Sequence, residues 1–298
     1  MEKRMNGTLV SEVLYDELRK FLEEKGDKPL QLVDISVGND FGGEMYANMK
    51  KKKIEKMVGY LVESRHFNSV SFDELVEVIE DINNDNEING VMLQLPLSKE
   101  LDAHERKILD HIDWRKDVDG LTTSSIGRLV VGEVSLEPCT PKGIITLLKI
   151  YGVDLLGKNV VIVNRSNIVG KPLEQLFLRE NATTTVCHSK TENLSEVCSR
   201  ADILVAAMNK QEMVDSSYLK DGAIVVDVGV HRNSEGKTVG DVNFGDVYDK
   251  CSLITPPTGG VGPMTICMLA YNTAKAKYGD EIDKVLDRGI EKAKMLVK

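Results

Sequence analysis

The chain has 298 residues, 29% of them charged, and a formal net charge of −9 at pH 7. This length predicts two domains, and the acidic balance argues against a nucleic-acid or anionic-membrane partner. No apolar run approaches the roughly 20 residues that a membrane-spanning helix needs, and five scattered cysteines without a Cys-x-x-Cys pair favour reduced thiols in a cytoplasmic protein over disulfides or a metal site.

The first third of the chain alternates helical and strand patterns. Residues 8–25 have apolar positions at helical spacing, and Gly26 is placed to end that helix. Residues 30–38 (LQLVDISVG) predict a buried strand, 72–84 a helix, and 88–97 (INGVMLQLPL) a second strand. This alternation predicts a parallel sheet with covering helices.

A polar segment at 111–129 (HIDWRKDVDGLTTSSIGRL) follows, and we expect it to form an irregular connection. We place the main domain boundary within it, at Asp119. The predicted domains are residues 1–119 and 120–272, and the helical segment at about 273–298 is expected to pack back on the first domain.

The second half repeats the alternation more clearly. Its candidate strands lie at 159–164, 182–188, 201–207, 223–229 and 252–255. Short strands with crossovers of this size are typical of a doubly wound, Rossmann-like dinucleotide-binding domain. The predicted fold class is therefore α/β, with an N-terminal α/β catalytic domain, a dinucleotide-binding domain and an active-site cleft between them.

Tyr46 and Lys50 stand four residues apart in a strongly helical stretch (GGEMYANMKKKKIEK), so they project from one helix face. If that face is buried, desolvation and the like charges at 51–53 disfavour the ammonium form of Lys50. An amine close to neutrality can accept and return protons. The alternative interpretation is that the four lysines form a solvated helix face.

The turn after the strand at 159–164 is expected to approach the pyrophosphate of a dinucleotide. It contains Asn164, Arg165 and Ser166, but the G-x-G-x-x-G pattern is absent. The next strand ends at Ser189 with no acidic residue to grip a ribose 2′-hydroxyl, so the site favours NADP, and NAD remains possible. A surface salt bridge is the alternative role for Arg165.

Four segments, YANMK, GVMLQLPL, KDVDGL and GGVGPMT, occur in an order that resembles the methylenetetrahydrofolate dehydrogenase/cyclohydrolase family. EPCTPKG, NRSNIVGKP, CHSKT, DVGV and GDVNF also match family segments, and the resemblance covers about residues 5–280. It implies a homodimeric enzyme that oxidises 5,10-methylenetetrahydrofolate to the 5,10-methenyl form with NADP+. The same enzyme would then hydrolyse the methenyl form to 10-formyltetrahydrofolate.

The resemblance also implies roles for four residues. Lys50 matches the general acid/base of the cyclohydrolase step, and Tyr46 matches an aromatic residue that stacks near the pterin. Gln94 matches the amide that holds the lysine, and Asp119 matches the carboxylate that binds the amino-pyrimidine edge of the pterin. A planar carboxylate can accept paired hydrogen bonds from such an edge.

Further positions follow from the same resemblance. The substrate-binding set adds Leu93 and Leu95 beside Gln94, with Gly259, Gly260 and Pro263 in a glycine-rich loop over the folate and nicotinamide. The cofactor-binding set is Asn164, Arg165, Ser166, Ser189 and Val230. No metal is expected, because His188 has no metal-ligand partner at a suitable spacing.

The chain departs from the family where Asn164 and Asn209 replace glycines and where Gly43 replaces a serine. Asparagine tolerates positive φ better than most residues, so the backbone path should survive. The two asparagine side chains, however, are expected to protrude towards the dinucleotide and weaken its binding. The alternatives are therefore a cyclohydrolase with impaired cofactor binding, or a non-catalytic folate-binding protein.

Overall fold

The computed structural model describes residues 2–38, 41–133 and 136–298, with the backbone alone described at 41–46. The chain forms two compact units, each assembled from separate stretches of sequence. Unit 1 comprises Met1–Glu12, Thr140–Thr265 and Ile290–Lys298, and unit 2 comprises Val13–Cys139 and Ile266–Gly289. The domain boundary at Asp119 and the cleft between domains stay predictions.

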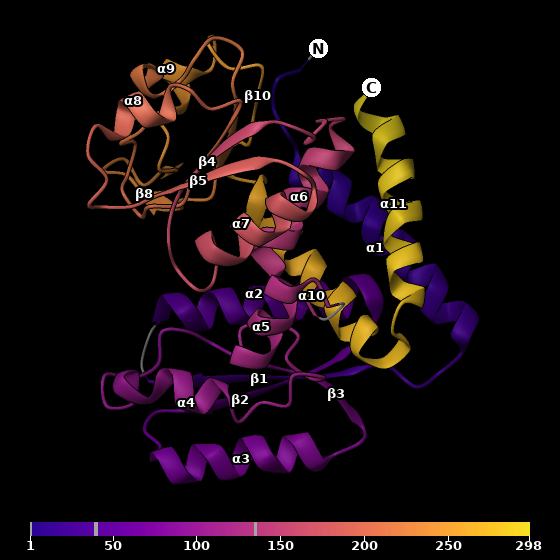
Figure 1. Cartoon of the computed structure of the whole chain (residues 1–298). Coiled ribbons are helices and arrows are strands. Elements are labelled where there is room, and N and C mark those ends of the chain that lie inside the picture. Colours follow the sequence, from indigo (N-terminus) through magenta and orange to yellow (C-terminus); the bar gives the residue numbers. More distant parts are fainter. Residues whose placement is uncertain (1, 39–40, 134–135) are drawn as a thin grey trace. The chain divides into compact units, whose positions relative to one another are not determined.

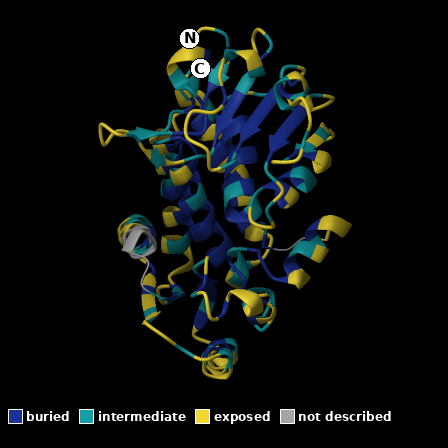
Figure 2. Cartoon of the chain, turned by 90° about the vertical axis from the view of Figure 1, so that its left-hand side faces the viewer, coloured by how far each residue is buried: buried dark blue, intermediate teal, exposed yellow. Residues whose placement is uncertain are grey.

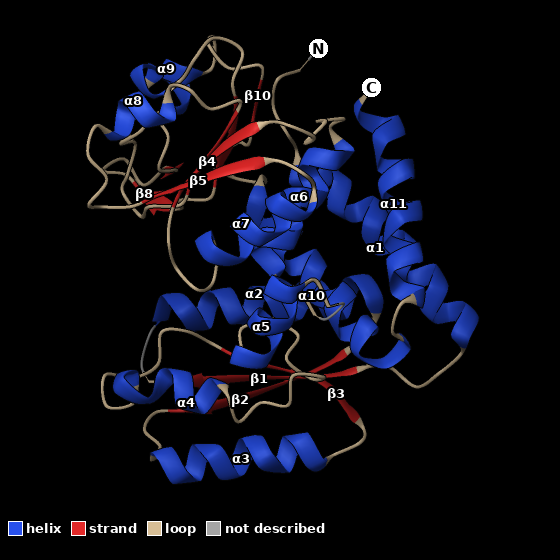
Figure 3. Ribbon diagram, viewed as in Figure 1, coloured by secondary structure: helices blue, strands red, loops and turns tan. Residues whose placement is uncertain are grey.

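Unit 2 contains a parallel sheet in the order β2-β1-β3. Its strands are β1 (Gln31–Val37), β2 (Leu61–Phe67) and β3 (Ile88–Leu93). The intervening helices are α2 (Phe41–Val58) and α3 (Phe72–Asn84), and Figures 1 and 3 show them on opposite sides of the sheet. The predicted parallel sheet with covering helices is confirmed.

The strand β2 is absent from the sequence prediction. Its residues (LVESRHF) include two charged side chains and a histidine, and most of the strand is exposed or half-buried. Because β2 lies at an edge of the sheet, it lacks the run of apolar residues that marks a buried strand.

The two faces of β1 have different surroundings because successive side chains point to opposite sides of a strand. Val33, Ile35 and Val37 join a hydrophobic core with Leu75 and Ile79 of α3. Asp34 lies between these positions and therefore points to the face opposite α3, the side on which Figure 1 shows α2.

The predicted irregular connection at 111–129 is wrong in its second half. The helix α5 (Thr123–Val131) begins there, and the hydroxyl of Thr122 caps it by accepting a hydrogen bond from the backbone N–H of Ser125 at 3.0 Å. The polar Thr-Thr-Ser-Ser run, which suggested a loop, is the capped start of a helix. Before it lie a 3-10 turn (Asp102–His104) and α4 (Glu105–Leu109).

Unit 1 contains a second parallel sheet in the order β10-β7-β6-β4-β5, which confirms the doubly wound prediction. Its strands are β4 (Asn159–Val163), β5 (Thr183–Cys187), β6 (Ile203–Ala206), β7 (Ile224–Asp227) and β10 (Leu253–Ile254). Each lies within one of the predicted ranges.

The central strands of this sheet are buried, as the dark ribbons of Figure 2 show. The remaining elements of this region are α6 (Cys139–Ile150), α7 (Gly170–Arg179), α8 (Leu194–Cys198), the 3-10 turn Ser216–Tyr218, α9 (Phe244–Val247), and the antiparallel pair β8 (His231–Arg232) and β9 (Thr238–Val239).

Three longer helices complete the described fold: α1 (Gly7–Lys25), α10 (Val261–Tyr278) and α11 (Glu281–Val297). Within unit 2, the Tyr271 hydroxyl of α10 donates to the carbonyl oxygen of Leu14 at 2.7 Å, and Lys25 pairs with Glu281 at 2.9 Å. None of the described helices is long and apolar enough to cross a membrane.

Candidate active site

Lys50 is buried on α2, with only 6% of its surface exposed, whereas Lys52 on the same helix is exposed. The Lys50 Nζ lies 3.4 Å from the Sδ of Met92 on β3. A fully buried lysine is rare unless it has partners or a function. The solvated-face alternative is therefore wrong for Lys50.

A buried carboxylate accompanies Lys50. Asp34 of β1 is 3% exposed, and the Nε2 of Gln94 donates to its two carboxylate oxygens at 2.8 and 3.0 Å. Burial raises the pKa of Asp34, while the nearby amine of Lys50 and the Gln94 hydrogen bond lower it. Sequence analysis missed Asp34, although an acidic residue inside an apolar strand pattern was a visible signal.

Asp119 is a second carboxylate beside Lys50. Burial raises its pKa, the Lys50 amine lowers it, and the neighbouring Asp117 raises it. Asp117 has a structural role, because it accepts hydrogen bonds from two backbone N–H groups and from the Ser125 hydroxyl at 2.7 Å. Unit 2 therefore brings Lys50, Gln94 and Asp119 of the predicted site together and adds Asp34.

The other predicted substrate residues of unit 2 are placed differently. The Leu93 side chain belongs to the core that packs against α3, and Leu95 packs against the same core. Their side chains are thus committed to packing. Tyr46 lies on α2 four residues before Lys50, as predicted, but its side chain lies outside the described residues. Gly43 lies in the same part of α2, where the backbone alone is described.

The glycine-rich loop lies in unit 1 and is packed tightly. Gly259 has φ +80°, and its carbonyl oxygen accepts the N–H of Thr8 at 3.0 Å. A Cβ on Gly7 would lie 1.9 Å from the Gly260 carbonyl oxygen, so only glycine fits there. The helix α10 begins at Val261, so Pro263 lies in its first turn rather than in the loop as predicted, at a position where a missing N–H costs nothing.

A cavity of about 320 Å³ opens at the carboxyl ends of β4, β5 and β6. The strand order changes direction between β4 and β6, and ligands of open α/β sheets bind at such a point. The cavity is lined by Val163, Asn164, Arg165, Ser166, His188, Ser189, Leu194, Ala207, Met208, Asn209, Lys210 and Met213.

The lining of this cavity suits an anionic dinucleotide. It includes four of the five predicted cofactor residues, and Val230, which is 69% exposed, is the one outside it. Among the described residues, no acidic side chain lines the cavity, and neither Arg165 nor Lys210 has an ion-pair partner. Two unpaired cations without a carboxylate favour a phosphate group.

Asn164 does not protrude into the cofactor site as predicted. Its Oδ1 accepts the backbone N–H groups of Ser166 at 2.7 Å and of Gly170 at 3.0 Å, and its Nδ2 donates to the carbonyl oxygen of Ala207. Its φ is also not positive. The amide is drawn inward because it satisfies the N–H of the first residue of α7 and ties the ends of β4 and β6 together.

Replacing Asn164 with glycine, the family residue, is therefore expected to destabilise the chain by about 2 kcal/mol through the lost hydrogen bonds. NADP+ should bind no more tightly than to the unsubstituted protein. Thermal unfolding and equilibrium binding of NADP+ measure the two effects. An unchanged melting temperature together with tighter NADP+ binding would restore the original prediction that this side chain obstructs the cofactor.

Asn209 has the positive backbone φ expected of an asparagine that replaces glycine, at +55°. Its loop is held by Asp241, a fully buried residue whose carboxylate accepts the backbone N–H groups of Met208, Asn209 and Lys210 at 2.7, 3.1 and 2.6 Å. The Nε2 of His231 lies 2.8 Å from the same carboxylate. Asp241 thus shapes one wall of the cavity without lining it.

Eight of the twelve lining residues were not predicted as cofactor residues, and His188 and Lys210 are the two of these that carry an ionisable side chain. His188 was expected to be structural, and Lys210 was noted only as part of a departure from the family. A cation in the loop that follows a strand of a dinucleotide-binding sheet was the available signal for Lys210.

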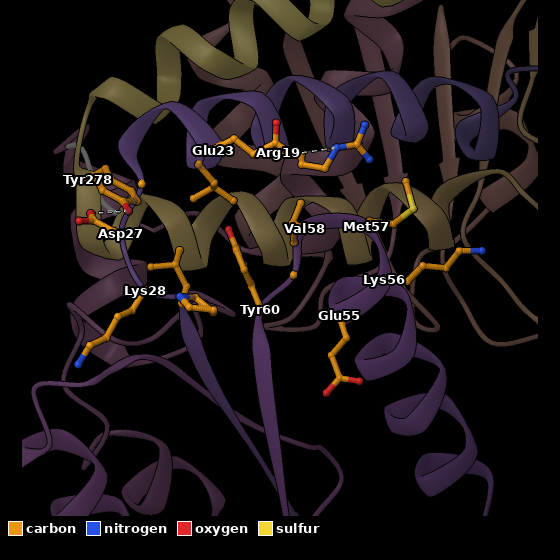
Figure 4. A pocket seen from close by; sticks show the side chains of 15 residues that line it. Arg19, Glu23, Asp27, Lys28, Glu55, Lys56, Met57, Val58, Tyr60 and Tyr278 are labelled. Carbon is orange, nitrogen blue, oxygen red and sulfur yellow. Dashed lines mark hydrogen bonds and ion pairs between the residues drawn. The ribbon is translucent and has the colours of Figure 1, made fainter.

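A larger cavity of about 410 Å³ lies in unit 2 (Figure 4). The last residues of α2, from Glu55 to Val58, line it, whereas Lys50 does not. Its wall mixes acids and bases: Arg19 lies 3.8 Å from Glu23, and the Tyr278 hydroxyl donates to Asp27 at 2.9 Å. The lining carries equal numbers of basic and acidic side chains, so the cavity offers no net charge to a folate or a nucleotide.

The two units define an α/β enzyme that binds a dinucleotide in one unit and buries an amine beside carboxylates in the other. Residues 5–119 match the family model of the tetrahydrofolate dehydrogenase/cyclohydrolase catalytic domain, and residues 138–280 match that of its NAD(P)-binding domain. The chain belongs to the tetrahydrofolate dehydrogenase/cyclohydrolase family, which confirms the resemblance found in the sequence.

Relatives and solved structures agree with this assignment. The bifunctional protein FolD of Agathobacter rectalis is 47% identical over 278 residues, which cover 93% of this chain and 99% of the relative. The bifunctional enzyme FolD of Campylobacter jejuni is 38% identical with a TM-score of 0.85, covering 91% of this chain and 97% of that one. The Trypanosoma brucei enzyme, solved with NADP and an inhibitor, is 30% identical with a TM-score of 0.82, covering 93% and 96%.

Proposed function

We propose that the chain is a bifunctional enzyme of one-carbon metabolism. It oxidises 5,10-methylenetetrahydrofolate with NADP+ and hydrolyses the resulting 5,10-methenyl form to 10-formyltetrahydrofolate. The observation that carries this proposal is the buried amine of Lys50, placed beside Asp34 and Asp119 in the unit that matches the family's catalytic domain. A non-catalytic folate-binding protein would have no need to bury an amine at this cost.

In the hydrolytic step, Lys50 acts as the general base that accepts a proton from the attacking water. The methenyl substrate is a cation, so it disfavours a neighbouring ammonium and favours the neutral amine that the step requires. Gln94 positions the reacting groups through its amide, and Asp119 accepts hydrogen bonds from the amino-pyrimidine edge of the pterin. Tyr46 stacks near the pterin.

The cavity at the ends of β4, β5 and β6 accommodates NADP, whose nicotinamide supplies the hydride acceptor when bound. Arg165 and Ser166 follow β4, and Ser189 follows β5, so cationic and hydroxyl donors converge on one cavity. Lys210 adds a second cation. This donor set suits the 2′-phosphate that distinguishes NADP from NAD.

Lys210→Ala is expected to weaken NADP+ binding by about tenfold and to change NAD+ binding by less than about twofold, because a charge-assisted bond to phosphate contributes about 1.5 kcal/mol or more. Arg165→Ala should behave in the same way. Lys190→Ala is the matched control, since this exposed lysine follows Ser189 but does not line the cavity. Equal losses of NADP+ and NAD+ affinity in Lys210→Ala would exclude a 2′-phosphate contact.

We also propose a cytoplasmic homodimer with the domains 1–119 and 120–272. All five cysteines are free and buried, which suits a reducing compartment. The homodimer rests on the family resemblance, and light scattering across a range of protein concentrations tests it.

Two assays test the function itself. NADP+-dependent appearance of methenyl absorbance from methylenetetrahydrofolate reports the dehydrogenase, and loss of methenyl absorbance reports the cyclohydrolase. We expect both, with NADP+ preferred over NAD+. Hydrolysis without oxidation would favour the alternative of a cyclohydrolase with impaired cofactor binding. Absence of both activities with retained folate binding would favour a non-catalytic folate-binding protein.

A further inference from the structure

Asp34 is a buried acid that the family roles above do not use. It lies in the middle of β1, flanked by Val33 and Ile35, and is 3% exposed. A buried carboxylate costs free energy unless it is hydrogen-bonded or paired with a cation. Asp34 therefore needs hydrogen-bond or charged partners in this otherwise apolar strand. Gln94 and Lys50, two residues of the proposed catalytic site, provide them.

The sheet register places Asp34 directly beside the site. Asp34 pairs with Met92 across β1 and β3, so their side chains point to the same face. The Sδ of Met92 lies 3.4 Å from the Nζ of Lys50, which brings the amine over that face. Gln94 lies two residues beyond Met92 and donates its Nε2 to both oxygens of Asp34.

The hydrogen bonds to Asp34 orient the amide of Gln94. An ionised carboxylate can only accept hydrogen bonds, so the amide must turn its NH2 group towards Asp34. Its carbonyl oxygen, the one acceptor of this side chain, then points away from β1. Gln94 is thereby fixed in the orientation in which it can accept a hydrogen bond from an amine, an ammonium or a water molecule.

The charges around Asp34 come from α2 and from the segment at 117–119. Burial raises the pKa of the Asp34 carboxyl group, Lys50 and Lys51 of α2 lower it, and Asp119 raises it. The charge of Asp117 acts in turn on Asp119. A negative charge at Asp34 stabilises positive charge close to it, including that of the cationic methenyl substrate, so the charge of Asp34 influences the pH dependence of the reaction.

We propose that Asp34 is a positioning residue for the cyclohydrolase reaction, which orients Gln94 and, through its charge beside Lys50, influences the pH dependence of the reaction. This proposal rests on the cyclohydrolase activity proposed above. Asp34 does not need to touch the substrate, because its hydrogen bonds and its charge act through Gln94 and Lys50.

The test is the pH dependence of methenyltetrahydrofolate hydrolysis, corrected for the uncatalysed reaction, in Asp34→Asn and Asp34→Val. Asn is nearly isosteric and keeps one acceptor for Gln94, whereas Val suits a buried strand and removes the polar group. Without the negative charge, the acidic limb of the kcat/KM profile should move to lower pH by about one to two units. The plateau kcat should fall about tenfold in Asp34→Val, which no longer orients Gln94.

Glu63→Gln is the matched control, because Glu63 lies on β2 beside Val33 but is exposed and paired with Arg65 at 2.7 Å. Its pH profile should superimpose on that of the unsubstituted protein. A folded Asp34 variant with an unshifted acidic limb overturns the proposal. Absence of hydrolysis in the unsubstituted protein instead refutes the proposed cyclohydrolase, so the two failures are distinguishable.

Discussion

Lys50→Met is expected to lower the rate of methenyltetrahydrofolate hydrolysis by about 10²- to 10⁴-fold, the usual contribution of a general base. Methionine has a similar length and suits the buried position beside Met92, so the fold and the folate-binding surface should be retained. The decay of methenyl absorbance measures the rate, and equilibrium binding of the same substrate measures what remains of the site.

Lys52→Met is the matched control for this substitution. It makes the same chemical change on the same helix, but at an exposed position two residues away. Hydrolysis should be unchanged in the control. Normal hydrolysis by a correctly folded Lys50→Met protein would show that another group accepts the proton.

The second large effect is expected at Asp241, which holds the loop that forms one wall of the cofactor cavity. Asp241→Asn replaces an acceptor of three backbone N–H groups with an amide that presents its own N–H donors to them. Buried donors are then left unsatisfied, at a cost of about 2–4 kcal/mol in unfolding free energy. NADP+ binding should weaken by at least about tenfold, because Lys210 and Asn209 lose their fixed backbone.

Asp221→Asn is the control for Asp241→Asn, because Asp221 belongs to the same unit but its side chain is 98% exposed. Denaturant unfolding and NADP+ titration should find it unchanged. If Asp241→Asn keeps both full stability and full NADP+ affinity, the loop does not depend on this carboxylate, and its position in the cavity wall has another cause.

Strong local patterns allowed most of the fold to be predicted. The central strands β4, β6 and β7 have continuous apolar runs because both faces of a parallel sheet are covered. The helix at 72–84 begins with a Ser71–Glu74 capping box that agrees with its amphipathic pattern. The edge strand β2 and the helix α5 were missed because their residues are polar. An edge strand needs no apolar alternation, and a helix start favours the same Thr and Ser residues as a loop.

The residues of the candidate site also differ in whether a local sequence pattern reveals them. Lys50, Gln94 and Asp119 were recognised because their motifs are contiguous in the sequence. Asp34 and Asp241 were missed because each acts on residues that are distant along the chain: Asp34 on Gln94, and Asp241 on the loop at 208–210. Such partners depend on which strands are neighbours and in which register, and no local pattern contains that information.

Asn164 marks the limit of prediction from a motif. The sequence by itself determined that the phosphate turn departs from the G-x-G-x-x-G pattern, that Lys50 belongs to a segment resembling the family and that the chain has two α/β parts. Only the tertiary structure decided that the Asn164 amide turns inward to cap α7 and that Lys50 is buried beside Asp34. The reason is physical: residue type limits which bonds a side chain can form, but its orientation and charge depend on the unsatisfied groups that folding brings to it.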